Sequence, residues 1–154
     1  MGGGAVDSRG QGFVAEARRS VAAPPEIAFD RLADHASWRA WMPRSFRPVG
    51  PPLGRLRVGD RPRVRIAGAL VPTPIEVFVV ERAREIGWRG GIRPLLYAEH
   101  RFLFDAADGG GTVVRSVETW SGALAPVARR LVQPVAERIG REQLDALARA
   151  VETK

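Results

Sequence analysis

The amino-acid sequence predicts an α+β domain in which a curved antiparallel sheet of about seven strands wraps a long C-terminal helix and encloses a ligand cavity. Two observations predict this class. Short segments that alternate apolar and polar residues fill most of the chain, and a long amphipathic segment ends it. Such a sheet must bury one face, and only the terminal helix is large enough to cover it. The length of 154 residues is that of one domain.

Two short helices are expected after the first strand. Residues 13–21 alternate well enough to form that strand. A helix is expected over residues 25–34, because Pro25 suits a first helical turn and Glu26 favours a helix N-terminus. A second helix is expected over residues 37–42, with Ser37 as its cap and Pro43 as its stop. The pair is expected to close one end of the curled sheet.

The remaining strands follow in the middle and late parts of the chain. Residues 45–54 are rich in proline and glycine, which favours irregular backbone or a poor edge strand. Alternation and β-branched residues predict strands over residues 61–67, 73–82, 85–91, 97–106 and 112–121. The last two strands flank a glycine-rich turn at residues 108–111, so they are expected to form a hairpin.

Residues 123–153 are expected to form the long helix, because their apolar residues recur at helical spacing. The stripe consists of Leu124, Ala128, Leu131, Val135, Ile139, Gln143, Leu147 and Val151. Within it, Leu131, Val135 and Leu147 are expected to pack against the sheet. Pro134 lies inside the segment and is expected to bend the helix, since proline lacks the amide hydrogen and clashes with the preceding turn.

Charge and composition limit the possible partners. The formal net charge is +7, and 23 of the 24 basic residues are arginines. They are spread along every segment, whereas nucleic-acid binders usually cluster basic residues, so no nucleic-acid partner is expected. No apolar stretch approaches the roughly 20 residues that cross a bilayer, so no transmembrane segment is expected. Residues 1–12 lack the apolar core of a secretory signal, which predicts a disordered leader, a ligand-binding domain over residues 13–154 and a cytoplasmic location. Monomer and homodimer both remain open.

The chain lacks the residue patterns of several common sites. Two histidines without any cysteine give no plausible zinc set, and no spaced acidic loop suggests calcium. The glycine runs lack the strand-to-helix context of a phosphate-binding loop. The pair Ser121-Gly122 does not fit the pattern of a nucleophile elbow. No metal and no cofactor is therefore expected.

Several fragments, in their order and spacing, resemble one superfamily. They are Val21-Ala-Ala-Pro-Pro-Glu-Ile-Ala-Phe29, Leu32-Ala-Asp-His35, Trp38 with Trp41, Leu56-Arg-Val-Gly-Asp60, His100-Arg-Phe-Leu-Phe104, Gly-Gly-Thr112 and Glu118-Thr-Trp-Ser-Gly122. From about Phe13 to Glu152 the chain is similar to the START-like, helix-grip superfamily, in its polyketide cyclase/dehydrase and lipid-transport branch (SRPBCC). The resemblance implies the helix-grip fold and binding of an apolar or aromatic small molecule, sometimes with aldol cyclisation or dehydration of a polyketide. It implies no fixed catalytic residues.

The last hairpin supplies candidate acid and base groups. If its strands pair symmetrically about the turn, their even-numbered residues share one face. That face is mainly apolar and is expected to point inward, since the odd face carries four charged residues. His100 and Glu118 are then close neighbours on the inner face. In an apolar pocket they can share a proton and act as acid and base near neutral pH. Alternatively, they form a structural pair that satisfies both groups.

Ligand pockets of this kind are mostly apolar and rich in aromatic side chains, although core packing is the alternative for each aromatic residue. The candidate ligand-binding residues are Trp41, Met42, Phe46, Trp88, Phe102, Ser116 and Trp120. Three functional hypotheses follow. The domain carries or senses a hydrophobic small molecule, or it is a polyketide cyclase or dehydratase that uses His100 and Glu118. The third hypothesis is a partner-binding regulatory protein with a vestigial cavity.

Overall fold

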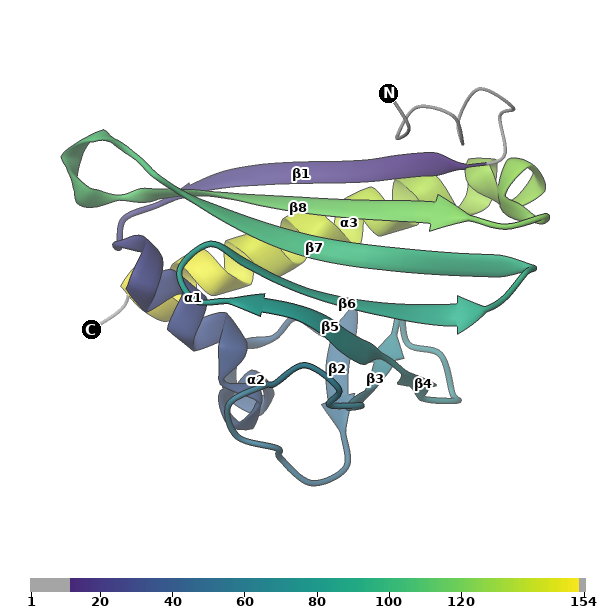
Figure 1. The fold of residues 1–154 in the computed structure, drawn as a ribbon, viewed down its shortest axis with the longest axis horizontal. Coiled ribbons are helices and arrows are strands. Elements are labelled where there is room, and N and C mark those ends of the chain that lie inside the picture. Colours follow the sequence, from purple (N-terminus) through teal and green to yellow (C-terminus); the bar gives the residue numbers. More distant parts are fainter. Residues whose placement is uncertain (1–11, 153–154) are drawn as a thin grey trace.

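The computed structural model describes residues 12–152, so the predicted leader lies outside the described residues except for Gly12. The elements follow the predicted order along the chain (Figure 1). They are β1 (Phe13–Val21), α1 (Pro25–Ala33), a 3-10 turn (His35–Ser37), α2 (Trp38–Trp41), β2 (Phe46–Val49), β3 (Arg63–Ile66), β4 (Thr73–Pro74), β5 (Glu76–Glu81), β6 (Glu85–Ile92), β7 (Leu96–Ala106), a second 3-10 turn (Asp108–Gly110), β8 (Thr112–Ser121) and α3 (Ala125–Glu152).

The α+β class and the antiparallel sheet around a terminal helix are confirmed, but the strands form two sheets instead of one. The larger sheet has the order β1-β8-β7-β6-β5, and the smaller has the order β2-β3-β4. The predicted strand over residues 73–82 is divided at Ile75, whose amide donates to the carbonyl of Pro62. Its neighbour Pro74 has no amide hydrogen for a ladder. In the proline-rich segment, β2 is the edge strand of the smaller sheet.

The long helix α3 lies along the larger sheet and packs mainly on β1 and β8 (Figure 1). Gly140 permits this close approach, because a Cβ atom at that position would lie 3.1 Å from Ser116 Oγ. At the opposite end from the start of α3, α1 packs against both α3 and β7 and closes the barrel-like space. Among residues 12–152, no helix has the length and apolar character needed to span a membrane.

The predicted register of the last hairpin is confirmed. His100 pairs with Glu118, and Phe102 pairs with Ser116, so even-numbered residues share a face. That face points inward, because Phe102 and Val114 are buried while Asp105 on the other face is exposed. Beneath it, a cluster of aromatic rings including Trp38 and Trp88 joins α2, β2, β6 and β7 with ring centroids 5.2–5.9 Å apart. The hairpin thus fixes which side chains face the interior.

The predicted buried stripe on α3 is correct only for its C-terminal half. Leu147 and Gln143 are buried, but Leu131 is 78% exposed, and Leu124 and Val135 are exposed as well. In the N-terminal half of the helix, Leu131, Val132 and Val135 line a cavity between the helix and the sheet, while Gln133 donates to the Val14 carbonyl of β1. The helix continues through Pro134 without interruption.

Leu131 can therefore be changed without unfolding the protein. Leu131→Ala is expected to alter the free energy of unfolding by no more than about 0.5 kcal/mol, as for other exposed substitutions. Urea denaturation of the variant and the wild type measures this difference. A loss of about 2 kcal/mol or more would show that Leu131 is buried in solution, since burial is what makes leucine truncation costly.

Candidate ligand-binding site

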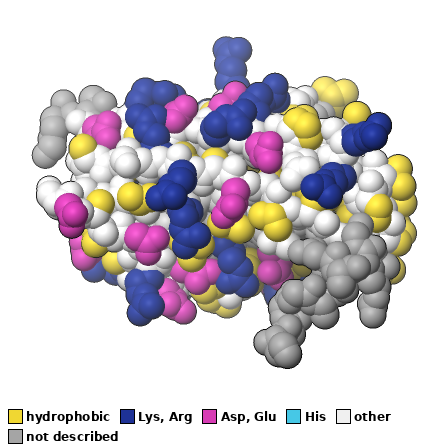
Figure 2. Space-filling view, turned by 90° about the horizontal axis from the view of Figure 1, so that it is seen from above, with side chains coloured by type: hydrophobic (Ala, Val, Ile, Leu, Met, Phe, Trp, Pro, Cys, Tyr) yellow, Lys and Arg dark blue, Asp and Glu magenta, His cyan; other side chains and the backbone are white. Residues whose placement is uncertain are grey.

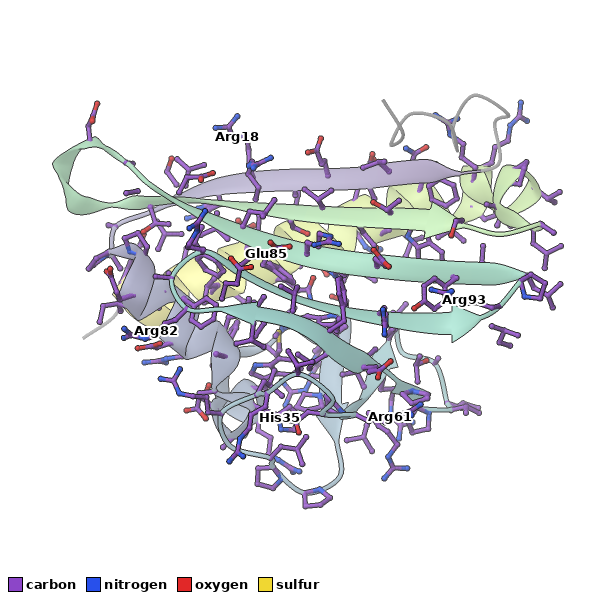
Figure 3. All side chains as sticks on the ribbon, in the orientation of Figure 1. Arg18, His35, Arg61, Arg82, Glu85 and Arg93 are labelled. Carbon is purple, nitrogen blue, oxygen red and sulfur yellow. The ribbon has the colours of Figure 1, made fainter. Side chains whose placement is uncertain are left out.

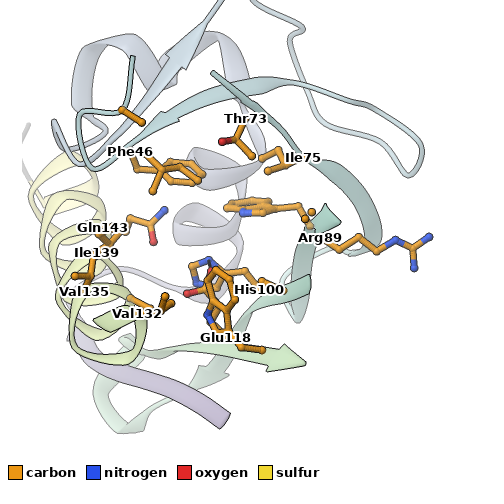
Figure 4. Close-up of a pocket in the computed structure, with 18 of the residues that line it drawn as sticks. Phe46, Thr73, Ile75, Arg89, His100, Glu118, Val132, Val135, Ile139 and Gln143 are labelled. Carbon is orange, nitrogen blue, oxygen red and sulfur yellow. Dashed lines mark ion pairs between the residues drawn. The ribbon is translucent and has the colours of Figure 1, made fainter. Parts of the chain in front are cut away.

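A cavity of about 390 Å³ lies between the inner face of the larger sheet, the smaller sheet and α3 (Figure 4). The lining comes from every wall. It consists of Phe46, Ile66, Ala69, Thr73, Ile75, Trp88, Arg89, Gly90, Gly91, Ala98, His100, Glu118, Trp120, Leu131, Val132, Val135, Ala136, Ile139 and Gln143. Most of these residues are apolar, and the volume falls in the range of small-molecule pockets, which is about 300–1,000 Å³.

Two aromatic rings form one wall of the cavity. Phe46 comes from β2 and Trp88 from β6, and their rings stack with centroids 5.9 Å apart and an interplanar angle of 23°. Trp88 also meets the His100 ring edge to face at 5.8 Å. Both Phe46 and Trp88 are almost fully buried, so their rings are held rigidly by the aromatic cluster beneath them. The wall presents flat aromatic surface to a ligand.

His100 lines the cavity and is held in one orientation by its neighbours. Its Nε2 lies 2.7 Å from Ser116 Oγ, and its ring stacks on Phe102 at 4.4 Å. Burial lowers the pKa of His100 to about 3, because the charged imidazolium loses its hydration. The imidazole is therefore neutral at pH 7. Ser116 and Phe102 contact the ring of His100 without lining the cavity themselves.

Glu118 on β8 lies next to His100 on β7. The contact between them is not a pair of opposite charges, because His100 is neutral near pH 7. Glu118 Oε2 is 3.7 Å from His100 Nδ1, which is too long for a hydrogen bond. Burial raises the pKa of Glu118 to about 7, and the nearby indole of Trp120 offsets only part of this effect. Since His100 is neutral at that pH, desolvation outweighs attraction between the two groups. The pair provides a carboxyl group that gains and loses its proton near neutral pH.

Gln143 and Trp120 bring further polar atoms to the cavity. Both amide atoms of Gln143 and Nε1 of Trp120 are buried and have no hydrogen-bond partner among residues 12–152. An unsatisfied buried polar group costs about 1–3 kcal/mol, and such groups are rare. Gln143 extends from α3, whereas His100 and Glu118 extend from the sheet wall (Figure 4). These unpaired atoms are available to the polar groups of a ligand.

The structure distributes the candidate residues over different environments. Phe46, Trp88, His100, Glu118 and Trp120 line the cavity. Phe102 and Met42 are core residues outside the lining, and Trp41 is half-buried at the end of α2, where its Nε1 donates to Ser37 Oγ. Ser37 also donates to the Asp34 carbonyl and makes no side-chain cap bond.

Of the lining residues that sequence reasoning missed, Gln143 is the one whose buried side-chain polar atoms have no partner among residues 12–152. It had been assigned to the apolar stripe of the helix, with no separate role. A glutamine among leucine, isoleucine and valine was nevertheless a usable signal, because a buried amide needs partners. Among the described residues, no group of three or more histidine, aspartate and glutamate side chains is placed to hold a metal ion.

One family model matches nearly all of the described residues, and solved structures share the fold. The family model described as "Polyketide cyclase / dehydrase and lipid transport" matches residues 13–152. No curated protein matches the chain in sequence. Among solved structures, the chain is similar to the ZhuI aromatase/cyclase from a Streptomyces species, with 21% identity, 92% and 94% of the two chains covered and a TM-score of 0.70.

Two further structures have the same fold. One is a protein from Mesorhizobium loti, with 18% identity, 92% and 99% of the chains covered and a TM-score of 0.72. The other is the di-domain aromatase/cyclase StfQ from the steffimycin biosynthetic pathway, with 16% identity, 97% of this chain and 53% of that chain covered and a TM-score of 0.72. Identities this low support the shared fold and say nothing of a shared substrate.

Proposed function

The chain belongs to the polyketide cyclase/dehydrase and lipid transport family, and on that premise we propose that its cavity binds a mainly apolar or aromatic small molecule bearing a neutral oxygen group. The domain then acts as a carrier or sensor of this molecule. The observation that supports the proposal is the set of unpaired polar atoms on Gln143 and Trp120 within an otherwise apolar cavity. A carbonyl oxygen of the ligand can accept from the N–H groups of Gln143 and Trp120, and a hydroxyl can also donate to Gln143 Oε1.

The charges around the cavity favour a neutral ligand. Arg89 is the one cationic residue in the lining, and its guanidinium group points away from the cavity (Figure 4). It pairs with Glu76 at 3.3 Å and lies over the ring of Phe78. Glu118 is protonated for much of the time near pH 7. A buried carboxylate on the ligand would have no counter-charge here, so the buried part of the ligand is expected to be uncharged.

A pair of bicyclic probes tests this proposal. Wild-type protein is expected to bind both 1-tetralone and tetralin, which differ by one carbonyl oxygen, in equilibrium dialysis. Gln143→Leu is expected to weaken 1-tetralone binding about three- to tenfold, the value of one hydrogen bond, and to leave tetralin binding unchanged. Gln133→Leu is the matched control, because Gln133 lies on the same helix and bonds to Val14 outside the cavity.

The possible results separate two failures. If the wild type binds neither probe, a binding cavity for apolar ligands is the wrong proposal. If both probes bind and Gln143→Leu changes neither affinity, the cavity binds ligands but Gln143 does not contact their oxygen.

The second candidate function is that of a polyketide cyclase or dehydratase. The observation that favours it is the carboxyl of Glu118, whose pKa of about 7 lies near the operating pH and beside the neutral imidazole of His100. The similar structures described as aromatase/cyclases agree with it. The third hypothesis, a regulatory protein with a vestigial cavity, is less supported, since about 390 Å³ remains open.

A further inference from the structure

Exposed apolar side chains surround the cavity opening. They occur on three segments: the turn before β4, the turn between β6 and β7, and the first turns of α3. Leu70, Val71, Ile92, Val127 and Leu131 are between 67% and 88% exposed. The cavity lining includes Ala69 and Leu131 from two of these segments, and Gly91, which directly precedes the third. We call these three segments, residues 69–71, 92–95 and 124–131, the mouth surface.

The three segments lie at one end of the molecule. The amide of Leu124 donates to the carbonyl of Leu95 at 2.9 Å, which joins the β6–β7 turn to the start of α3. The turn before β4 reaches the same cavity from the smaller sheet. Figure 2 shows apolar side chains gathered at the right-hand end of the molecule, which is where α3 begins and β6 ends in Figure 1. Separate apolar residues are normal on a surface, but a group around a pocket opening marks an interaction site.

This end of the molecule has an unusual charge distribution. The segments that build it, residues 61–75, 86–98 and 119–136, contain seven of the 24 basic residues and none of the 17 acidic residues. Each segment is bounded along the chain by two carboxylates, which are Asp60 and Glu76, Glu85 and Glu99, and the buried Glu118 and Glu137. Seven is also the formal net charge of the whole chain. The other 17 basic residues equal the 17 acidic residues in number, so these segments account for the formal net charge.

Most of these arginines are free to meet an anionic partner. Within residues 12–152, Arg89 alone of the seven forms an ion pair. Arg65 donates to the backbone carbonyl of Leu70, and Arg93 lies 4.0 Å from the centroid of the Tyr97 ring. At the opposite end, by contrast, Arg82 pairs with Asp30 beside α1 (Figure 3).

We propose that the mouth surface docks on lipid bilayers that contain anionic lipid, and that the cavity exchanges its apolar ligand with the bilayer. The exchange rests on the proposed function, whereas the docking does not. Exposed apolar side chains between arginines suit the boundary between acyl chains and anionic headgroups. A bilayer accepts apolar residues that protrude from three separate turns, whereas a protein partner would need a pocket for each. An apolar ligand is also far more soluble in the bilayer than in water.

Vesicle flotation with the full-length protein tests the docking. The wild type is expected to float with vesicles of phosphatidylcholine and phosphatidylserine, much less with phosphatidylcholine alone, and less at high salt. Arg129→Gln/Arg130→Gln is expected to lower the partition coefficient by roughly 25-fold, at about fivefold for each charge. Leu70→Ser/Val127→Ser is expected to lower it about tenfold or more, because two apolar side chains no longer insert.

A matched variant separates docking from general charge attraction. Arg138→Gln/Arg141→Gln removes two charges from exposed positions on the same helix, beyond the mouth surface. This variant is expected to float nearly as well as the wild type. Equal losses in both double-arginine variants would overturn the proposal, because the attraction would then depend on net charge alone. Absence of vesicle binding by the wild type, together with retention on a polyglutamate matrix, would also overturn it and assign the surface to an acidic protein partner.

The dialysis experiment distinguishes this inference from the proposed function. Leu70 and Val127 do not line the cavity, so their double variant is expected to bind 1-tetralone as the wild type does. If 1-tetralone binds but vesicles do not, the docking inference alone is wrong. If vesicles bind through the mouth surface but 1-tetralone does not, the docking stands and the proposed cavity function fails.

Discussion

Relative to the wild type, Glu118→Gln is expected to gain about 3 kcal/mol of unfolding free energy between pH 4.5 and pH 8. Burial raises the pKa of Glu118 from 4.5 to about 7 in the folded protein. Between these values the native state binds more protons than the unfolded chain, so this carboxyl lowers stability as the pH rises. The rise of the pKa from 4.5 to about 7, at about 1.4 kcal/mol for each pKa unit, gives this free-energy difference. Glutamine keeps the shape of the side chain and abolishes its titration.

His100→Gln provides the mirror-image control. Burial lowers the pKa of His100 from 6.5 to about 3, so the native state binds fewer protons than the unfolded chain between these values. The histidine therefore costs stability as the pH falls below 6.5, and its removal is expected to gain about 2 kcal/mol between pH 6.5 and pH 4.5. In the wild type the two slopes oppose each other, so only the differences between variant and wild type separate them.

Chemical denaturation at five or six pH values measures both differences. A Glu118→Gln curve that runs parallel to the wild-type curve would mean that Glu118 titrates alike in the folded and unfolded states. The cavity would then be wetter than its lining indicates. If the difference in unfolding free energy from the wild type changes with pH in opposite directions for the two variants, burial disfavours the charged form of each group.

The second large expected effect is the loss of proton transfer in a Glu118→Gln variant. It distinguishes the two hypotheses, because an enzyme transfers a proton and a carrier does not. In the enzyme, the Glu118 carboxylate takes a proton from the carbon next to a ligand carbonyl, and the electrons of that bond move into an enolate. In this hypothesis the buried N–H groups of Gln143 and Trp120, which line the same cavity and have no partner among residues 12–152, donate to the enolate oxygen. Glu118 is the better base of the pair, because the pKa of His100 is only about 3.

Exchange of the α-protons of 1-tetralone in D₂O, followed by NMR, measures this step. Glu118→Gln is expected to slow the protein-dependent exchange about 10²–10⁴-fold, while 1-tetralone affinity changes much less. The wild-type rate is expected to rise with pH through about 7, as the Glu118 carboxyl ionises. Gln133→Leu serves again as the control outside the cavity. If 1-tetralone binds but exchanges no faster than in free solution, the carrier hypothesis is favoured.

The hairpin shows how far sequence reasoning can reach. A short glycine-rich turn leaves few ways to pair two strands, so the adjacency of His100 and Glu118 could be predicted from residue numbers alone. Their protonation could not be predicted in the same way. The sequence suggested a shared proton, whereas burial disfavours the charged form of each group, which leaves His100 neutral and lets Glu118 titrate near pH 7.

The burial of other residues could not be predicted, because it depends on how the helices and strands pack together. Helical periodicity is the same along α3, so it could not tell that Leu147 meets the sheet while Leu131 faces outward. Trp41 and Met42 lie within the short helix predicted over residues 37–42. Neither lines the cavity, because that helix packs on β2. The arginines seemed evenly spread along the sequence. The segments that form the mouth end contain no carboxylates, and the acidic residues lie in the other segments.

The uneven placement of charge also makes the molecule an electric dipole. The helix α3 begins at the arginine-rich end and finishes near α1, so its own dipole points the same way and adds about half a positive charge at the mouth. A negatively charged surface thus turns the protein before any contact forms, with the cavity opening in front. At physiological ionic strength this torque acts within about 8 Å, so it orients the last step of an encounter and does not attract from afar.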